Sequence, residues 1–197
     1  YDRLVGSEMC IRDRNKLEQE KTNQKNISSI KNLNLAYHPM YLGDSNSAKV
    51  IYEFVDYNCG YCQKFHQELL NVMNDSSLKL VIIQMPILGN FSEELTKLAL
   101  ASSLQGQFKV VHNYLYSTER KSKMEDILAD LFLRGVDLDI LKNDLDSQEV
   151  SDFLSIHRSY ADEFKFTGTP ATIIGNQIIP GFIDADKITE ILEKEFS

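Results

Sequence analysis

Two cysteines with two residues between them stand in a stretch whose pattern places them at the start of a helix. Cys59 and Cys62 enclose Gly60 and Tyr61 within Val50–Leu70, VIYEFVDYNCGYCQKFHQELL. The apolar run before the cysteines predicts a buried strand, and the residues after them predict a helix. At a helix N-terminus, unpaired N–H groups and the positive end of the helix dipole favour a thiolate over a thiol. The pattern therefore predicts a redox-active pair with Cys59 as its reactive thiol.

Thiol–disulfide exchange is the chemistry that fits this pair. A spacing of three residues places the second sulfur within bonding distance one helical turn on, so we expect Cys59 to attack and Cys62 to resolve the mixed disulfide. A structural disulfide and half of a zinc site are the two alternatives. Zinc needs about four ligands, commonly from a second pair of cysteines or histidines, and the sequence offers no such second pair.

A second signal lies far along the chain, in Phe166–Ile174, FTGTPATII. Pro170 follows Thr169 at the entrance of a predicted strand. A bond between any residue and proline at such an entrance is where a cis peptide is tolerated. The alternative is an ordinary proline at the first residue of a strand.

The cysteine motif and the Gly-Thr-Pro run together resemble the thioredoxin superfamily, and within it the DsbA-like thiol–disulfide oxidoreductases of the cell envelope. The resemblance covers Val50 to Phe196. It is nearest to the ScsC-like and DsbC-like members, in which Gly-Tyr between the cysteines and Thr before the proline are familiar. Four further blocks match the family: Glu53–Tyr57, Pro86–Gly89, Gln105–Phe108 and Gly175–Gly181.

The resemblance implies an α/β fold, a thioredoxin-like fold with an inserted helical domain. The residue pattern predicts strands at Val50–Val55 and Leu78–Met85, a hairpin over Ala171–Pro180 and a last helix at Asp184–Phe196. Helical periodicity fills the stretch from Ser92, expected as an N-cap, to Phe164. We therefore assign 49–90 and 165–197 to the thioredoxin-like domain and 91–164 to the inserted helical domain.

The beginning of the chain differs from the rest. Residues 1–14, YDRLVGSEMCIRDR, resemble the translation of a sequencing adapter, so we expect a non-native or disordered segment and set Cys10 apart with it. A native disordered terminus is the alternative. Residues 15–48 predict a helical arm followed by a linker that starts at Tyr37. If residues 1–14 are foreign, a signal peptide could have been lost with the true start.

Thr169, Pro170, Gly60 and Tyr61 are the residues that the resemblance places beside the cysteines. In the family, the loop with the cis-proline lies next to the redox pair and helps to hold the substrate peptide, which pairs with the backbone as an added strand. The dipeptide between the cysteines tunes the reduction potential.

Two further residues are candidates for tuning the thiols. Glu53 lies on the predicted strand at the position of a buried acid in DsbA, where it could relay the proton of Cys62; a solvent-facing residue is the alternative. His66 lies one helical turn after Cys62 and could tune the thiols through its charge, although a surface histidine is the reading that we favour. His38, His112 and His157 are read as structural.

The net charge and the apolar content limit the classes of protein to which the chain can belong. The formal net charge of −8 disfavours a nucleic-acid partner. No apolar run approaches the roughly 20 residues that span a bilayer. The resemblance implies exchange of disulfides with unfolded or misoxidised envelope proteins, as an oxidase or as an isomerase or reductase. It also implies a periplasmic or envelope location, a membrane redox partner of DsbB or DsbD type, and no metal or cofactor beyond the Cys59–Cys62 disulfide.

Two questions stay open at this point. ScsC-like relatives use an N-terminal stalk to oligomerise, so a homo-oligomer through the arm is one expectation. The alternative function is a copper-binding thioredoxin-like protein, because soft thiolates at Cys59 and Cys62 suit Cu(I). The sequence does not fix the direction of exchange, because Cys-x-x-Cys thiols span a wide range of acidity.

Overall fold

The computed structural model describes residues 2–33, 39–74 and 77–197, which leaves His38 outside the described residues. The chain divides into two compact units, Tyr1–Leu33 and Asn34–Ser197. Helix α1, Asp2–Lys31, makes up the first unit. It confirms a helix in the arm and also runs through the segment before residue 15, so residue 14 marks no break in the helix. The foreign origin of residues 1–14 stays a prediction.

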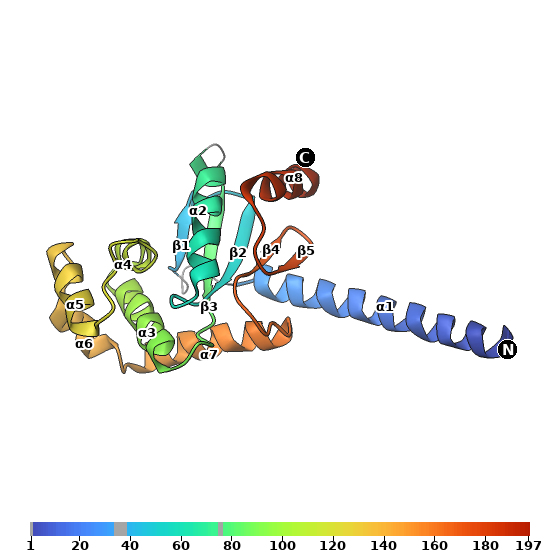
Figure 1. The fold of residues 1–197 in the computed structure, drawn as a ribbon, viewed down its shortest axis with the longest axis horizontal. Helices are drawn as coiled ribbons and strands as arrows, with labels where there is room; N and C mark the ends of the chain where they lie inside the picture. The colour runs from blue at the N-terminus through green and yellow to red at the C-terminus, as the bar shows by residue number, and fades with distance from the viewer. Residues whose placement is uncertain (1, 34–38, 75–76) are drawn as a thin grey trace. The chain divides into compact units, whose positions relative to one another are not determined.

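The second unit is organised around a five-stranded sheet in the order β1-β3-β2-β4-β5 (Figure 1). Strands β2 and β3 are parallel, and the other neighbouring pairs are antiparallel. The strands predicted before the cysteines, after the first helix and in the hairpin are confirmed. Their bounds are β1 Tyr41–Gly43, β2 Val50–Val55, β3 Lys79–Gln84, β4 Ala171–Ile174 and β5 Gln177–Pro180.

Strand β1 corrects one sequence prediction. Residues 41–43 were expected to belong to a linker, but they pair with β3, with Leu42 opposite Leu80. Met40 and Leu42 are buried in the core, which explains why this short stretch joins the sheet. Three residues are too few for a period of two to show in the sequence.

Helix α2, Gly60–Asn74, connects β2 to β3, and α8, Ala185–Phe196, packs beside it. Both helices are amphipathic, and their apolar faces meet side chains of the sheet. Phe65 and Leu69 of α2 and Ile188 of α8 lie in one core cluster with Ile51 and Val55 of β2. This packing fixes the start of α2 at the carboxyl end of β2, where open α/β sheets place their active sites.

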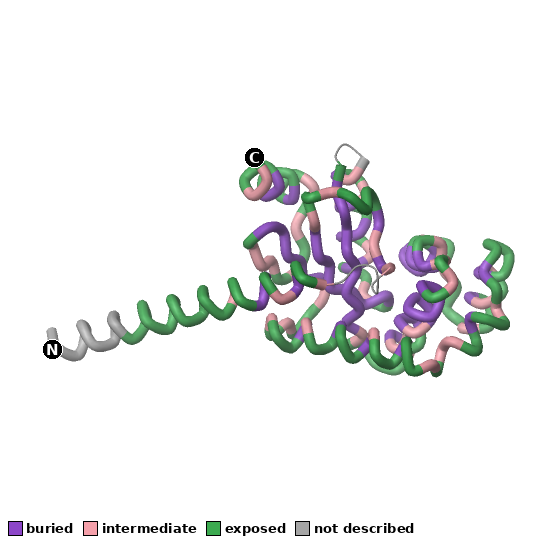
Figure 2. The backbone as a smooth tube through the Cα atoms, turned by 180° about the vertical axis from the view of Figure 1, so that it is seen from behind, coloured by how far each residue is buried: buried purple, intermediate pink, exposed green. Residues whose placement is uncertain are grey.

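Five helices lie between β3 and β4 in the sequence and form the inserted region (Figure 1). Their inner faces are buried and their outer faces exposed (Figure 2). The result is the predicted α/β thioredoxin-like fold with an added helical part. The helices are α3 Asn90–Leu104, α4 Phe108–Leu115, α5 Met124–Leu133, α6 Leu138–Asp144 and α7 Gln148–Glu163.

The start of α3 differs from the prediction. The helix begins at Asn90, with Gly89 at the N-cap position, so the expectation that Ser92 caps it is wrong. Gly89 has φ of 99°, a conformation that favours glycine, and it lets the chain turn from the preceding loop into the helix. Ser92 is buried inside the first turn instead.

Candidate active site

Cys59 lies between the end of β2 and the first residue of α2. Its N–H donates to the carbonyl oxygen of Asp56 at 3.0 Å, and its own carbonyl oxygen accepts from the N–H of Gln63 at 3.2 Å. Its thiol donates to the carbonyl oxygen of Thr169 at 3.4 Å, across 110 positions of sequence. The Thr169–Pro170 peptide bond is cis. The structure thus brings together the two motifs that the sequence singles out.

Cys62 differs from Cys59 in its surroundings. Cys59 is partly exposed, whereas Cys62 is fully buried, and both are free thiols in this structure. Burial raises the pKa of the Cys62 thiol well above its usual value, and interactions with the Asp56 backbone and the Thr169 side chain offset only part of that rise. One sulfur is therefore accessible to a substrate, and the other is held as a thiol behind it.

Gly60 and Tyr61 separate the two sulfurs on the outer side of α2. A Cβ atom at Gly60 would meet nothing within 4 Å, so the glycine leaves the approach to Cys59 open. Tyr61 is 64% exposed, and the Lys64 ammonium lies 5.5 Å from the centre of its ring.

Asp56 is a site residue that the sequence reasoning missed. Its buried carboxylate accepts the backbone N–H groups of Asn58 at 2.8 Å, Ile87 at 2.8 Å and Leu88 at 3.0 Å. These bonds fix the loop that carries Cys59 to the loop after β3. Asp56 follows β2 directly and lies three residues before Cys59, but its partners in the loop after β3 are 31 and 32 positions away, so the sequence alone does not show its role.

Glu53 and His66 lie beneath the cysteines, and both are buried. The solvent-facing alternative for Glu53 and the surface location that we favoured for His66 are therefore wrong. The Nδ1 atom of His66 lies 3.9 Å from Oε2 of Glu53. Burial raises the pKa of Glu53, and His66 lowers it. His66 turns inward because its position, four residues after the buried Cys62, continues the apolar face of α2.

His66 packs against His112 and Tyr116, and Tyr57 packs against both of these, in a cluster that no sequence pattern predicts. The His66 ring centre lies 4.7 Å from that of His112 and 5.0 Å from that of Tyr116. The Tyr57 hydroxyl is 2.8 Å from Nδ1 of His112. Burial lowers the pKa of His112 well below its usual value. His157 lies apart, where its Nδ1 accepts the backbone N–H of Gln84 at 2.9 Å.

Comparison with known proteins places this arrangement in a family. A family model described as thioredoxin matches residues 36–194. The chain belongs to the thioredoxin family, with the DsbA-like proteins. A curated relative, probable disulfide bond formation protein D of Bacillus cereus, is 24% identical over 169 residues, 78% of this chain and 77% of that protein.

Two solved structures share this DsbA-like fold. The thiol–disulfide exchange protein alpha-DsbA2 from Wolbachia pipientis has a TM-score of 0.79 and 24% identity, covering 90% of this chain and 97% of that one. A periplasmic thioredoxin-like protein from Salmonella enterica serovar Typhimurium has a TM-score of 0.65 and 20% identity, covering 79% of this chain and 88% of that one.

Four exposed apolar side chains lie on segments that belong to the redox motif or are hydrogen-bonded to its neighbours in this DsbA-like chain, and we call them the apolar rim: Tyr61, Ile87, Leu88 and Phe182. Tyr61 lies between the cysteines in the sequence, and Asp56 accepts from the backbone N–H groups of Ile87 and Leu88. Phe182 follows Gly181, whose N–H donates to the carbonyl oxygen of Pro170 at 2.8 Å. Three separate segments linked to the redox motif therefore carry exposed apolar side chains.

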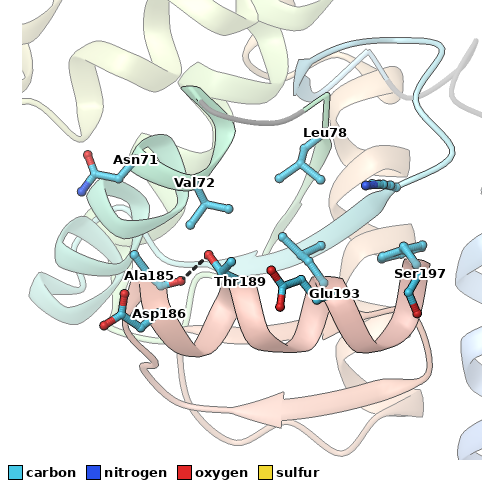
Figure 3. A pocket seen from close by; sticks show the side chains of 11 residues that line it. Asn71, Val72, Leu78, Ala185, Asp186, Thr189, Glu193 and Ser197 are labelled. Atoms are coloured by element: carbon cyan, nitrogen blue, oxygen red, sulfur yellow. Dashed lines mark hydrogen bonds between the residues drawn. The ribbon is translucent and has the colours of Figure 1, made fainter.

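Other features lie away from this centre. A cavity of about 530 Å³ opens between α2 and α8, with Val72, Thr189 and Glu193 among its lining residues (Figure 3). It contains none of the redox residues.

Within the described residues, no three His, Cys, Asp or Glu side chains are grouped so as to hold a metal ion. No described helix combines the length and the apolar character needed to cross a membrane.

Proposed function

We propose that this chain is a disulfide donor, which transfers the Cys59–Cys62 disulfide to extended protein substrates. The observation that carries the proposal is the contact of the exposed Cys59 thiol with the carbonyl oxygen of Thr169, in front of a buried Cys62. This arrangement lets a substrate reach one sulfur while the other stays shielded from it. Thiol–disulfide exchange needs this asymmetry, because the mixed disulfide must form at one defined sulfur.

The shape of the site supports an extended polypeptide as the substrate. The backbone at Thr169 lies beside Cys59, where it could pair with a substrate segment as an added strand. The apolar rim offers contact to apolar side chains on either side of the substrate cysteine. Such side chains are exposed in unfolded proteins and buried in folded ones, so the site selects unfolded or misoxidised proteins.

Disulfide transfer proceeds in three steps. A substrate thiolate attacks Sγ of Cys59 in the oxidised pair, a new sulfur–sulfur bond forms, and Cys62 leaves as a thiolate. The buried Cys62 thiolate then takes a proton from the carboxyl group of Glu53. A second substrate thiolate attacks the substrate sulfur of the mixed disulfide and releases Cys59 as a thiolate. The substrate gains a disulfide, and the pair gains two electrons.

Two observations support the donor direction. The Bacillus cereus relative is named as a disulfide bond formation protein. Helix α2 begins directly after Cys59, and the positive end of its dipole stabilises the reduced pair. A stabilised reduced form makes a strong oxidant. Isomerase or reductase activity is the competing direction, and it would gain support from a homo-oligomer formed through the N-terminal arm in light scattering.

The location and partners follow from the same proposal. The similar Salmonella protein is described as periplasmic, and we propose the periplasm or cell envelope for this chain. There a membrane partner of DsbB type would reoxidise the pair, and one of DsbD type would serve the reducing direction. The copper-binding alternative requires both thiolates. Because Cys62 is buried and its pKa is raised, the site favours exchange over copper binding.

Two single substitutions test the proposal with a reduced, unfolded dithiol protein as substrate. Cys59→Ser is expected to abolish disulfide transfer and to form no mixed disulfide. Cys62→Ser cannot form the internal disulfide, so it is first converted to a mixed disulfide between Cys59 and glutathione. A protein substrate with a single thiol then displaces the glutathione and is expected to stay linked to Cys59, which a gel without reductant shows. Full transfer activity in the Cys59→Ser variant would overturn the proposal, and so would mixed disulfides at Cys62 in that variant.

A further inference from the structure

The buried side of the active site holds an acid and an imidazole in close proximity. The side chains of Glu53 and His66 are 0% and 1% exposed, and Oε2 of the acid lies 3.9 Å from Nδ1 of the imidazole. This separation is within ion-pair range but too long for a hydrogen bond. Among the described residues, no hydrogen bond shorter than 3.5 Å satisfies either side chain. A charge on either group therefore depends on the other, because an unpaired buried charge is costly.

Burial keeps the neighbouring His112 from taking up a charge. It lowers the pKa of His112 well below its usual value, and the nearby His66 lowers it further. The Gln84 amide donates to the Tyr57 hydroxyl oxygen at 3.0 Å, and that hydroxyl lies 2.8 Å from Nδ1 of His112. The structure therefore leaves His66, whose Nδ1 lies 3.9 Å from Oε2 of Glu53, as the imidazole beside the acid.

The remaining ionisable groups around Glu53 do not compete for the proton. Burial raises the pKa values of Tyr57 and Tyr116 far above neutral, so both stay protonated. Asp56 is engaged by three backbone N–H groups. The guanidinium of Arg120 donates to the carbonyl oxygen of Tyr57 at 3.0 Å. The ionisable groups that interact with the acid come from three segments: Cys62 and His66 of α2, Tyr57 of the loop after β2, and Tyr116 directly after α4.

We propose that His66 is a positioning residue that controls whether Glu53 is ionised, and thereby whether Glu53 can exchange a proton with Cys62. This role rests on the proposed exchange function. When Cys62 resolves a mixed disulfide and re-forms the internal disulfide, it first gives its proton to the Glu53 carboxylate. The Cys62 thiolate then attacks Sγ of Cys59, the internal disulfide forms, and the substrate leaves as a thiolate carrying the electron pair of the broken bond. Disulfide donation runs through the same proton transfer in reverse.

The direction of the effect follows from the charges. Resolution needs Glu53 as a carboxylate, so the rate rises with pH as Glu53 ionises. His66 lowers the pKa of Glu53. In a His66→Gln variant, the ionisation of Glu53 and the resolution rate are therefore both expected to shift to higher pH. At a fixed pH below the midpoint, the rate falls about tenfold for each pH unit of that shift, and it recovers at alkaline pH.

Two readouts on the full chain test the proposal. Infrared difference spectra follow the carboxylic acid band of Glu53 against pH, with Glu53→Gln to assign the band. Stopped-flow kinetics follow the resolution of the mixed disulfide with glutathione over the same pH range. His157→Gln is the matched control, because it removes another buried imidazole, whose Nδ1 accepts the backbone N–H of Gln84. We expect it to lower stability without moving either midpoint.

Two results together would support the proposal. The infrared midpoint and the rate midpoint both move to higher pH in His66→Gln, and adding His66→Gln to Glu53→Gln changes the rate profile no further. An infrared midpoint that stays in place, or a rate profile that does not follow it, would overturn the proposal. His66→Asn, a shorter neutral amide that keeps Glu53 in place, carries the same two readouts if His66→Gln unfolds. A wild-type chain that resolves no mixed disulfide would instead refute the proposed function, while the infrared titration still reports on the pair.

Discussion

The carboxylate of Asp56 is the best place to test how this fold holds its active site together. It joins the loop that carries Cys59 to the loop after β3 through three backbone hydrogen bonds of 2.8–3.0 Å. Asp56→Ala removes both acceptor oxygens, and with them all three hydrogen bonds, and leaves three N–H groups without their charged partner. The substitution should therefore loosen both loops and lower the free energy of unfolding.

The size of the loss can be worked out from these contacts. A hydrogen bond to a charged group contributes about 1.5–3 kcal/mol, so three give about 5 kcal/mol at the low end. Water can replace part of this in the opened loop, so we expect a loss of about 3–5 kcal/mol. That is a large share of the roughly 5–15 kcal/mol by which a domain is stable.

Urea unfolding followed by circular dichroism measures this loss. Asp146→Ala is the matched control, because Asp146 is 88% exposed and pairs with Lys97 at 3.0 Å on the surface. Such a pair contributes at most about 1 kcal/mol. If Asp56→Ala unfolds outright, Asp56→Asn, which keeps one acceptor oxygen, is expected to lose less than the alanine variant. A loss below about 1 kcal/mol for Asp56→Ala would refute the reasoning.

Two further predictions concern the acid and the rim. Glu53→Gln should raise the melting temperature at pH 7, by about 2–4 °C for each kcal/mol gained. Burial raises the pKa of Glu53 above its unfolded value, so the acid costs stability as pH rises from that value. The gain should therefore shrink towards pH 4, and calorimetry showing a pH-independent gain would contradict this. Phe182→Ser should slow oxidation of an unfolded protein about threefold to tenfold through KM, with oxidation of dithiothreitol unchanged, because only the protein contacts the rim. Leu133→Ser, an 81% exposed leucine on α5 at the outer edge of the inserted helices (Figure 1), is its control and should change neither rate. Equal slowing with both substrates would argue against a binding role for Phe182.

The sequence predicts the scaffold well where periodicity and motif agree. The strand before the cysteines and the hairpin after Pro170 are found within a few residues of their expected bounds, and helices occupy most of the stretch that was expected to be helical. Local patterns suffice there because each element buries one continuous face. The start of α3 was misplaced because Ser92 has a residue type that caps helices, yet the turn at Gly89 had already begun the helix.

The buried centre could not be predicted in the same way. His66 and His112 are 46 positions apart, and only the packing of α4 against α2 brings their rings to 4.7 Å. Asp56 could be recognised only once the loop after β3 was placed beside it. Such contacts depend on tertiary packing and leave no periodic trace in the sequence. The proximity of Cys59 and Thr169, in contrast, was accessible because the family resemblance already linked their motifs.

The reduction potential of the Cys59–Cys62 pair is the most direct test of the proposed disulfide donor. It is obtained by equilibrating the protein with glutathione buffers and measuring the oxidised fraction. We expect a reduction potential near that of DsbA, about −120 mV, because the start of α2 stabilises the reduced pair. A value near that of thioredoxin, about −270 mV, would contradict it and would identify a reductase instead.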